Sequence, residues 1–114
     1  MNKQEAFQAL RNTLTVRKSL LVEVAATSNR RLALDQLRQG LEEAEVAVLN
    51  FRDFILETDA RYFSERELLA ANKAMVLRAE YRKLASLASL TEYQGLVFEA
   101  EVLEDQFLIL SKGV

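Results

Sequence analysis

The sequence contains no cysteine, no histidine and no proline, and it has only three glycines. Without cysteine there can be no disulfide framework, thiolate zinc site or cysteine nucleophile, and the chain is compatible with a reducing compartment, so we expect a cytoplasmic protein. Without histidine the commonest general base and a common metal ligand are missing. These absences exclude most familiar catalytic mechanisms, and we expect a protein that is not an enzyme and that holds no metal or cofactor.

Long apolar runs are also missing. Charged residues interrupt every hydrophobic stretch before it reaches the roughly 18 to 20 residues that a membrane span needs, so we expect a soluble protein with no membrane partner. Charged and polar residues run through the first fourteen positions, and the long apolar stretch of a secretory signal is missing there. Fifteen Lys plus Arg against 17 Asp plus Glu leave a net charge of −2, which provides no field to attract nucleic acid.

The chain is rich in residues that favour helices. Ala, Leu, Glu, Arg and Lys dominate, and these residues lose least when a helix forms. Half of the 114 residues are apolar, which is enough for one modest core and too little for two, so residues 1–114 are expected to form a single domain. We expect an all-α fold, namely a small antiparallel bundle of three to four long amphipathic helices that forms oligomers.

The spacing of apolar residues predicts where the helices lie. Steps of three and four residues predict a first helix over residues 2–26, in which one position of the apolar stripe is taken by Arg17 or Lys18. The polar stretch 27–29 favours a turn and the N-cap of the next helix. A second helical region is expected over residues 30–58, because an apolar stripe continues through it with a heptad-like spacing typical of coiled coils.

Three positions predict helix breaks. Gly40 interrupts the second region, and because glycine costs about 1 kcal/mol in a helix interior we expect a kink or short break there. Ser64 and Glu67 have the spacing of a capping box, which predicts a helix start at Ser64. Thr91 and Gln94 repeat that spacing and predict a restart or kink before a fourth helix. The stripe expected on that fourth helix consists of Tyr93, Leu96, Ala100, Leu103, Phe107 and Leu110.

Carboxylates are the remaining candidates for chemistry. Two acidic clusters could act as an acid/base pair or as oxygen ligands for a hard cation. Their members alternate with the positions of the apolar stripes, so we expect them to face water. Basic residues are interleaved with acids and should form ion pairs on exposed helix faces, and no glycine-rich loop offers a phosphate or small-molecule site. The acidic clusters are Glu42, Glu43 and Glu45, and Glu99, Glu101, Glu104 and Asp105.

Two helices are more apolar than contact with one core requires. In the stretch AEVAVLNFRDFIL, at 44–56, some apolar residues lie outside the regular stripe, so the apolar part of the helix surface is wider than one core contact needs. The last helix has the same feature between Val97 and Ile109. A small bundle can cover one helix on two sides but hardly two, so we expect the extra surface to contact a second copy or another helical protein. The candidate interface residues, some of which must also be core, are Leu49, Phe51, Phe54, Ile55, Phe98, Val102 and Phe107.

Three segments carry a family resemblance. They are GLEEAEVAVLNFRD at 40–53, SERELLAANKAMVL at 64–77 and LTEYQGLVFEAEVLEDQFLIL at 90–110, and together they cover about the last two-thirds of the chain. A long helix with Asn-Phe-Arg-Asp late in it, then a polar break, a capped helix and a final amphipathic segment, resembles the small helical proteins of the YlbF/YmcA group, including its YheA-like members. The stretch TSNRR at 27–31 departs from the acidic, aromatic turn that is usual after the first helix of that family.

The resemblance implies a non-catalytic bacterial or phage protein that forms homo- or hetero-oligomers and acts as a regulatory subunit, and it offers no catalytic residue to carry over. Our leading hypothesis is therefore a helical protein–protein interaction or regulatory module, either a homodimer or a hetero-oligomer with another helical protein. The alternative is a structural or scaffolding component, such as a small phage or assembly protein, which would form large assemblies. A third hypothesis is weak nucleic-acid binding, which would show a salt-sensitive affinity for RNA or DNA.

Overall fold

The computed structural model describes the backbone of residues 1–25 and 28–114, and the side chains of 1–18 and 28–114. Over the described residues the chain is helical, without strands, which confirms the expected all-α bundle. The count of three to four helices is wrong, because the last helical segment is divided in two. The elements are α1 (Lys3–Ala25), α2 (Arg30–Glu57), the 3-10 helix η1 (Ala60–Tyr62), α3 (Glu65–Ala85), α4 (Leu90–Leu96) and α5 (Phe98–Leu110).

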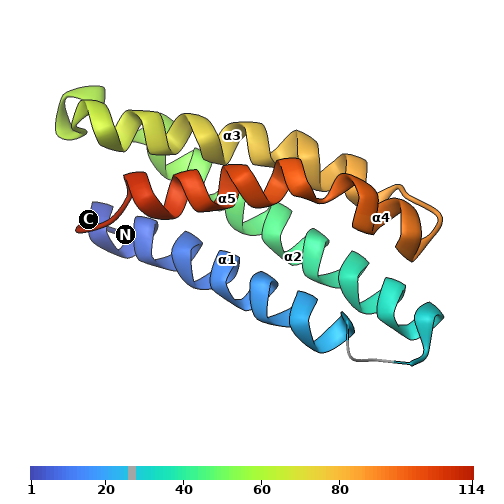
Figure 1. Cartoon of the computed structure of the whole chain (residues 1–114). Coiled ribbons are helices and arrows are strands. Elements are labelled where there is room, and N and C mark those ends of the chain that lie inside the picture. The colour runs from blue at the N-terminus through green and yellow to red at the C-terminus, as the bar shows by residue number, and fades with distance from the viewer. Residues whose placement is uncertain (26–27) are drawn as a thin grey trace.

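The helices form an elongated up-and-down bundle with extents of 48 × 21 × 21 Å. In Figure 1, α1, α2, α3 and the α4–α5 segment alternate in direction, and both termini lie at the same end. The backbone of α2 packs closely against α1 and α3, and α3 packs closely against α5, whereas α1 and α5 do not approach one another as closely. Long side chains therefore have to fill the seam between α1 and α5. None of the helices in the described part of the chain combines the length and apolar character that crossing a membrane requires.

Three buried phenylalanine rings connect three of the helices. Phe7 of α1 meets Phe51 of α2 edge to face, with ring centroids 4.9 Å apart. Phe107 of α5 lies 6.0 Å from Phe7 and 5.7 Å from Phe51. Such aromatic pairs stabilise a core by about 0.5–1.5 kcal/mol beyond the area that they bury. Phe51 and Phe107 are thus core residues of the monomer, and neither is accessible to a partner.

Side-chain caps set two of the helix starts, as the sequence predicts. Asn29 caps α2, because its side-chain oxygen accepts a hydrogen bond from the backbone N–H of Leu32 at 3.1 Å. At α3 the predicted capping box is confirmed: Ser64 Oγ accepts from the N–H of Glu67 at 3.1 Å, and the Glu67 carboxylate accepts from the N–H of Ser64 at 2.7 Å. Both helices therefore begin where local hydrogen bonding alone would place them.

The other two expected breaks differ from the structure. α2 runs without interruption through Gly40, because Leu37 and Leu41 beside it are buried and their packing outweighs the cost of one glycine, about 1 kcal/mol. A break does precede α4, but the cap is Ser89 instead of Thr91, with Ser89 Oγ accepting from the N–H of Glu92 at 3.2 Å. The predicted first helix matches α1 as far as Ala25, and its expected last residue lies outside the described residues.

Candidate functional site

The buried face of α5 differs from the stripe that the apolar residues predict. Leu96 is exposed, while Leu103 and Leu110 are only half-buried. The true inner face repeats every three or four residues, but one of its positions is a carboxylate. Counting apolar residues alone therefore rotates the face away from its actual direction. From Tyr93 to the end of the chain the buried residues are Tyr93, Val97, Ala100, Glu104, Phe107 and Ser111.

Glu104 lies at the centre of a buried polar cluster between α1, α3, α4 and α5. Its exposed fraction is 0%, and that of Arg17 is 3%. The Arg17 guanidinium donates through Nε and Nη2 to the two oxygens of Glu104, a bidentate arrangement. Tyr81 Oη donates to Glu104 Oε2 at 2.5 Å, and Arg17 Nη1 donates to Tyr93 Oη at 3.2 Å. The expectation that the acids face water is therefore wrong for Glu104.

Burial and hydrogen bonding shift the pKa values of three groups of this cluster, Arg17, Tyr81 and Tyr93. Burial lowers the pKa of Arg17, but its hydrogen bonds with Glu104 and the charge of that carboxylate raise the pKa by more, so the guanidinium stays charged. Burial is also the largest cause of the raised pKa values of the Tyr81 and Tyr93 hydroxyls, which stay protonated at neutral pH. The Arg17 guanidinium and the Glu104 carboxylate are thus partners within the cluster. The hydrogen bonds of the cluster connect α1, α3, α4 and α5.

A second charge pair crosses the same seam nearer the surface. Lys18 of α1 forms an ion pair with Asp105 of α5, one residue along from each member of the buried pair. Both side chains are more than a third exposed, so water and salt screen this interaction and it contributes little to stability. The seam between α1 and α5 is therefore polar at its centre and at its outer edge.

The outer face of α5 carries exposed apolar side chains. Phe98 is 70% exposed and Ile109 is 62% exposed, with Val102 between them on the same side of the helix. On the adjacent helix α3, Leu69 and Val76 are about half exposed and lie two turns apart. We call these five residues the α3/α5 strip.

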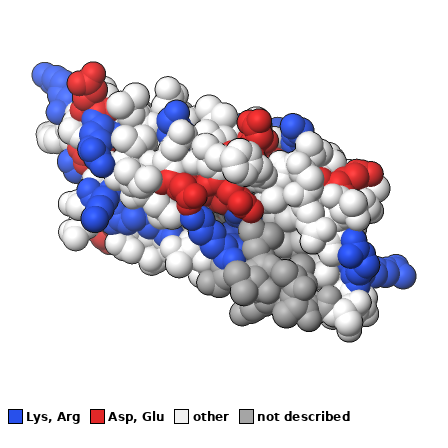
Figure 2. Space-filling model, viewed as in Figure 1, with Lys and Arg blue, Asp and Glu red and all other residues white. Residues whose placement is uncertain are grey.

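The two parts of the strip lie on neighbouring, antiparallel helices. Arg66, near the start of α3, donates to the backbone carbonyls of Ile109 and Leu110, at the end of α5, at 2.9 and 3.1 Å. Figure 2 shows mostly uncharged surface over α5 and the near side of α3, with acidic side chains and adjoining basic ones along one border and separate acidic and basic side chains along the other. The strip is thus a long apolar surface with charged margins.

The candidate interface residues of α2 lie elsewhere. Leu49, Phe54 and Ile55 are half-buried, and the Phe54 ring packs edge to face on Phe63 with centroids 6.1 Å apart. The exposed large apolar residues of this stretch of α2 are Val46 and Leu56, which are separated along the helix by about 15 Å. Most of the wide apolar arc of AEVAVLNFRDFIL is therefore covered within the monomer, and of the sequence-based candidates Phe98 and Val102 are the exposed ones.

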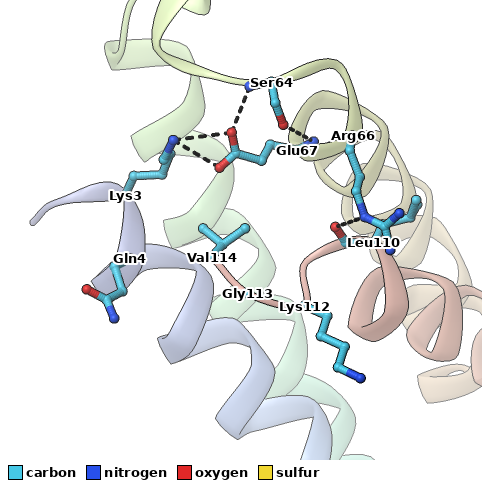
Figure 3. A pocket seen from close by; sticks show the side chains of 9 residues that line it. All are labelled: Lys3, Gln4, Ser64, Arg66, Glu67, Leu110, Lys112, Gly113 and Val114. Atoms are coloured by element: carbon cyan, nitrogen blue, oxygen red, sulfur yellow. Dashed lines mark hydrogen bonds and ion pairs between the residues drawn. The ribbon is translucent and has the colours of Figure 1, made fainter.

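A hollow of about 490 Å³ lies where both termini meet the start of α3 (Figure 3). Two of the cations that line it have partners: Lys3 Nζ forms an ion pair with Glu67 at 3.0 Å and donates to the carbonyl of Tyr62, and Arg66 donates to carbonyls at the end of α5. Burial raises the pKa of Glu67, but hydrogen bonds from Ser64 and Lys3 lower it by more. These contacts make the hollow a junction between chain segments.

Comparison of the chain with protein-family models, with curated proteins and with solved structures found no match. Among the described residues, His, Cys, Asp and Glu side chains form no group of three that could hold a metal ion. The candidate functional site is therefore the α3/α5 strip, argued from its own geometry.

Proposed function

We propose that this chain is a non-catalytic helical interaction module that presents the α3/α5 strip to another helical surface in a homo- or hetero-oligomer. The observation that carries the proposal is the exposure of Phe98 and Ile109 beside Val102 on one face of α5. Contiguous exposed apolar surface is uncommon on soluble monomers and typically marks a surface that a partner covers. The resemblance to the YlbF/YmcA group implies the same kind of role.

The free energy of association requires several residues of the strip to be buried together. Full burial of one large apolar side chain contributes about 1.5–3 kcal/mol. Association costs about 4–15 kcal/mol in lost freedom of motion, so a single exposed residue cannot hold a complex together. Five apolar residues on two adjacent helices can supply enough, provided that one partner surface covers all of them.

The first experiment is the molar mass in solution, measured by light scattering over a wide dilution range. We expect a defined oligomer that dissociates on dilution. The variant Phe98→Glu places a charge in the buried contact and should shift the mass to that of the monomer. The matched control is Leu56→Glu, because Leu56 of α2 has a similar exposure, at 75%, and lies outside the strip.

The outcomes separate the hypotheses. A folded monomer at every concentration, with no difference between wild type and Phe98→Glu, would contradict the proposal. Open-ended assemblies whose mass grows with concentration would favour the scaffolding alternative. Circular dichroism of both variants shows whether the helices are intact, so that loss of mass is not confused with loss of fold.

A further inference from the structure

The last helical segment has two faces that are suited to packing against the core. The face that the structure buries contains a carboxylate, Glu104, and a hydroxyl, Ser111. The other face contains only apolar and aromatic side chains, namely Tyr93, Leu96, Ala100, Leu103, Phe107 and Leu110. Burial of apolar surface alone therefore favours the face that the structure does not use.

A small rotation of α5 relates the two faces. They share three positions and differ by one residue at each of the other three, as with Leu103 in place of Glu104. Successive residues of a helix are about 100° apart, so the mean difference between the faces is a rotation of about 50°. Leu103 and Leu110 already pack against the edge of the core, and this rotation would complete their burial. We call this alternative packing the rotated setting.

Arg17 of α1 explains why the rotated setting is not adopted. Its buried guanidinium binds both oxygens of Glu104, to which Tyr81 Oη also donates at 2.5 Å. The rotation would carry this carboxylate away and leave the guanidinium buried without its counter-charge. Loss of one partner from a buried pair disfavours a packed state by a factor of about a hundred to several thousand. This penalty exceeds what the further burial of two half-buried leucines contributes.

The other polar contacts of the described residues impose no such penalty. Each of the other ion pairs has at least one side chain that is about a third or more exposed, as in the pair of Lys18 with Asp105 on the same seam. An exposed charge that loses its partner is hydrated, so a rotation of α5 has little effect on its free energy. Arg11 and Arg66 donate to carbonyls at the end of α5 through long, at least partly exposed side chains, which can follow a small rotation.

We propose that the buried pair of Arg17 and Glu104 selects the rotation of α5 about its own axis. Desolvation offsets much of the attraction between the two charges, so the pair adds little net stability. It does separate the observed packing, in which the charges meet, from the rotated setting, in which they do not. The rotation also decides which side chains α5 presents outward, because in the rotated setting Val102 turns toward α3 and Glu101 turns outward. Only this consequence for the α3/α5 strip rests on the proposed function.

Thiol labelling measures the rotation, because the native chain has no cysteine. Leu103→Cys and Leu108→Cys are matched reporters, since both leucines are half-buried and lie on opposite edges of the buried face. The rotated setting buries position 103 and exposes position 108. The ratio of the labelling rate at position 108 to that at position 103 therefore reports the rotation, whereas a general loosening of the helix raises both rates. Ala100→Cys is the control for local unfolding, because position 100 belongs to both faces.

The test combines Arg17→Met with Glu104→Leu in one chain and compares it with the native pair at high dilution. We expect the ratio to rise several-fold, because neither face of α5 then carries a charge and the rotated setting becomes populated. Position 100 should stay protected. An unchanged ratio in the folded double variant would overturn the inference. Labelling at position 100 as fast as at position 108 would overturn it too, because the pair would then be needed for the fold itself.

Arg17→Lys is the conservative control. Lysine keeps a cation opposite Glu104 but loses the bidentate geometry, so this variant should be less stable and should still show the wild-type ratio. A ratio shifted as far as in the double variant would mean that disturbed packing, and not the charge, sets the rotation. That result would overturn the inference.

The labelling ratio does not depend on an oligomer, so this inference and the proposed function can fail separately. A chain that is monomeric at every concentration, but whose ratio rises in the double variant, keeps the selection of the rotation and removes the function of the strip. An oligomer that Phe98→Glu dissociates, together with an unchanged ratio, keeps the function and removes the selection.

Discussion

The inner and outer faces of α5 each hold a side chain of the unexpected kind. On the inner face Glu104 is fully buried, and on the outer face Phe98 is mostly exposed. Arg17, Tyr81 and Tyr93 form the polar cluster around Glu104, so its burial is explained within one chain. Among the described residues no comparable set covers Phe98. A buried charge can thus be compensated inside the fold, whereas an exposed aromatic ring is better explained by a second molecule.

Removing one member of the buried pair should have the largest effect. Glu104→Leu leaves the Arg17 guanidinium buried without a counter-charge, and Arg17→Leu does the same to the carboxylate. Each single variant should lower the free energy of unfolding by about 3–5 kcal/mol, measured by urea denaturation at a fixed protein concentration.

The double variant Arg17→Met with Glu104→Leu is the matching control, because it removes both charges together. Its stability should lie near that of the wild type, or up to about 1–4 kcal/mol above it, as is found when apolar residues replace a buried ion pair. A double variant as unstable as the sum of the singles would contradict the view that the two charges compensate one another.

The Tyr81 hydroxyl should be the next most important part of the inner face. Tyr81→Phe removes a 2.5 Å hydrogen bond to a buried carboxylate and should cost about 1.5–3 kcal/mol. Tyr93→Phe loses a longer contact of 3.2 Å with Arg17 and should cost less. Thermal unfolding of both variants tests this order, and equal losses would show that the shorter bond has no special weight.

Alkaline pH should weaken the inner face more gradually. Because burial raises the pKa of Tyr81 and Tyr93, the folded chain keeps both protons at pH values where the unfolded chain begins to lose them, near pH 10. Their contribution to stability is therefore complete below pH 10 and is lost as the pH rises above it. The slope should reach about 1.4 kcal/mol per pH unit for each tyrosine. Urea titrations between pH 8 and 11 measure this slope, and Tyr81→Phe should reduce it.

The outer face should show the smallest effect on the stability of the monomer. Under dilute conditions Phe98→Ser should change the free energy of unfolding by no more than about 0.5 kcal/mol, since the ring is mostly exposed in the isolated chain. The same variant at high concentration should still reduce the molar mass of the oligomer. A large loss of stability at high dilution would instead make Phe98 part of the fold and would remove the contrast between the two faces.

Local signals in the sequence predict the helix starts well, because a cap is formed by residues that are close together in the chain. Asn29 and Ser64 are examples. Gly40 shows the limit of such signals, because its local cost is outweighed by packing that involves other helices. The sequence predicts Thr91 as the cap of α4, whereas the structure uses Ser89. Both residues can cap a helix in the same turn, so the local sequence does not distinguish between them.

The buried cluster left a signal in the sequence that apolar counting overlooks. Arg17 and Glu104 each occupy a regular position in a stripe of three- and four-residue steps, and their charges are opposite. A charged residue inside an apolar stripe is thus a candidate for burial, provided that another stripe offers its counter-charge. The sequence does not reveal which helices become neighbours. For the same reason it does not show that the apolar residues of α2 are largely covered within the monomer, while those on the outer face of α5 are exposed.

The bond between Arg17 and Glu104 also has a consequence in time. Its two ends are 87 residues apart, so α1 cannot complete its contacts until almost the whole chain has been synthesised. Until α5 arrives, docking of α1 would bury a guanidinium without its carboxylate, so we expect α2 and α3 to associate first. A fragment that ends before Phe98 should then leave the amides of α1 less protected against hydrogen exchange than those of α2. During synthesis α1 therefore stays undocked, with Arg17 hydrated, until the last helix has been made.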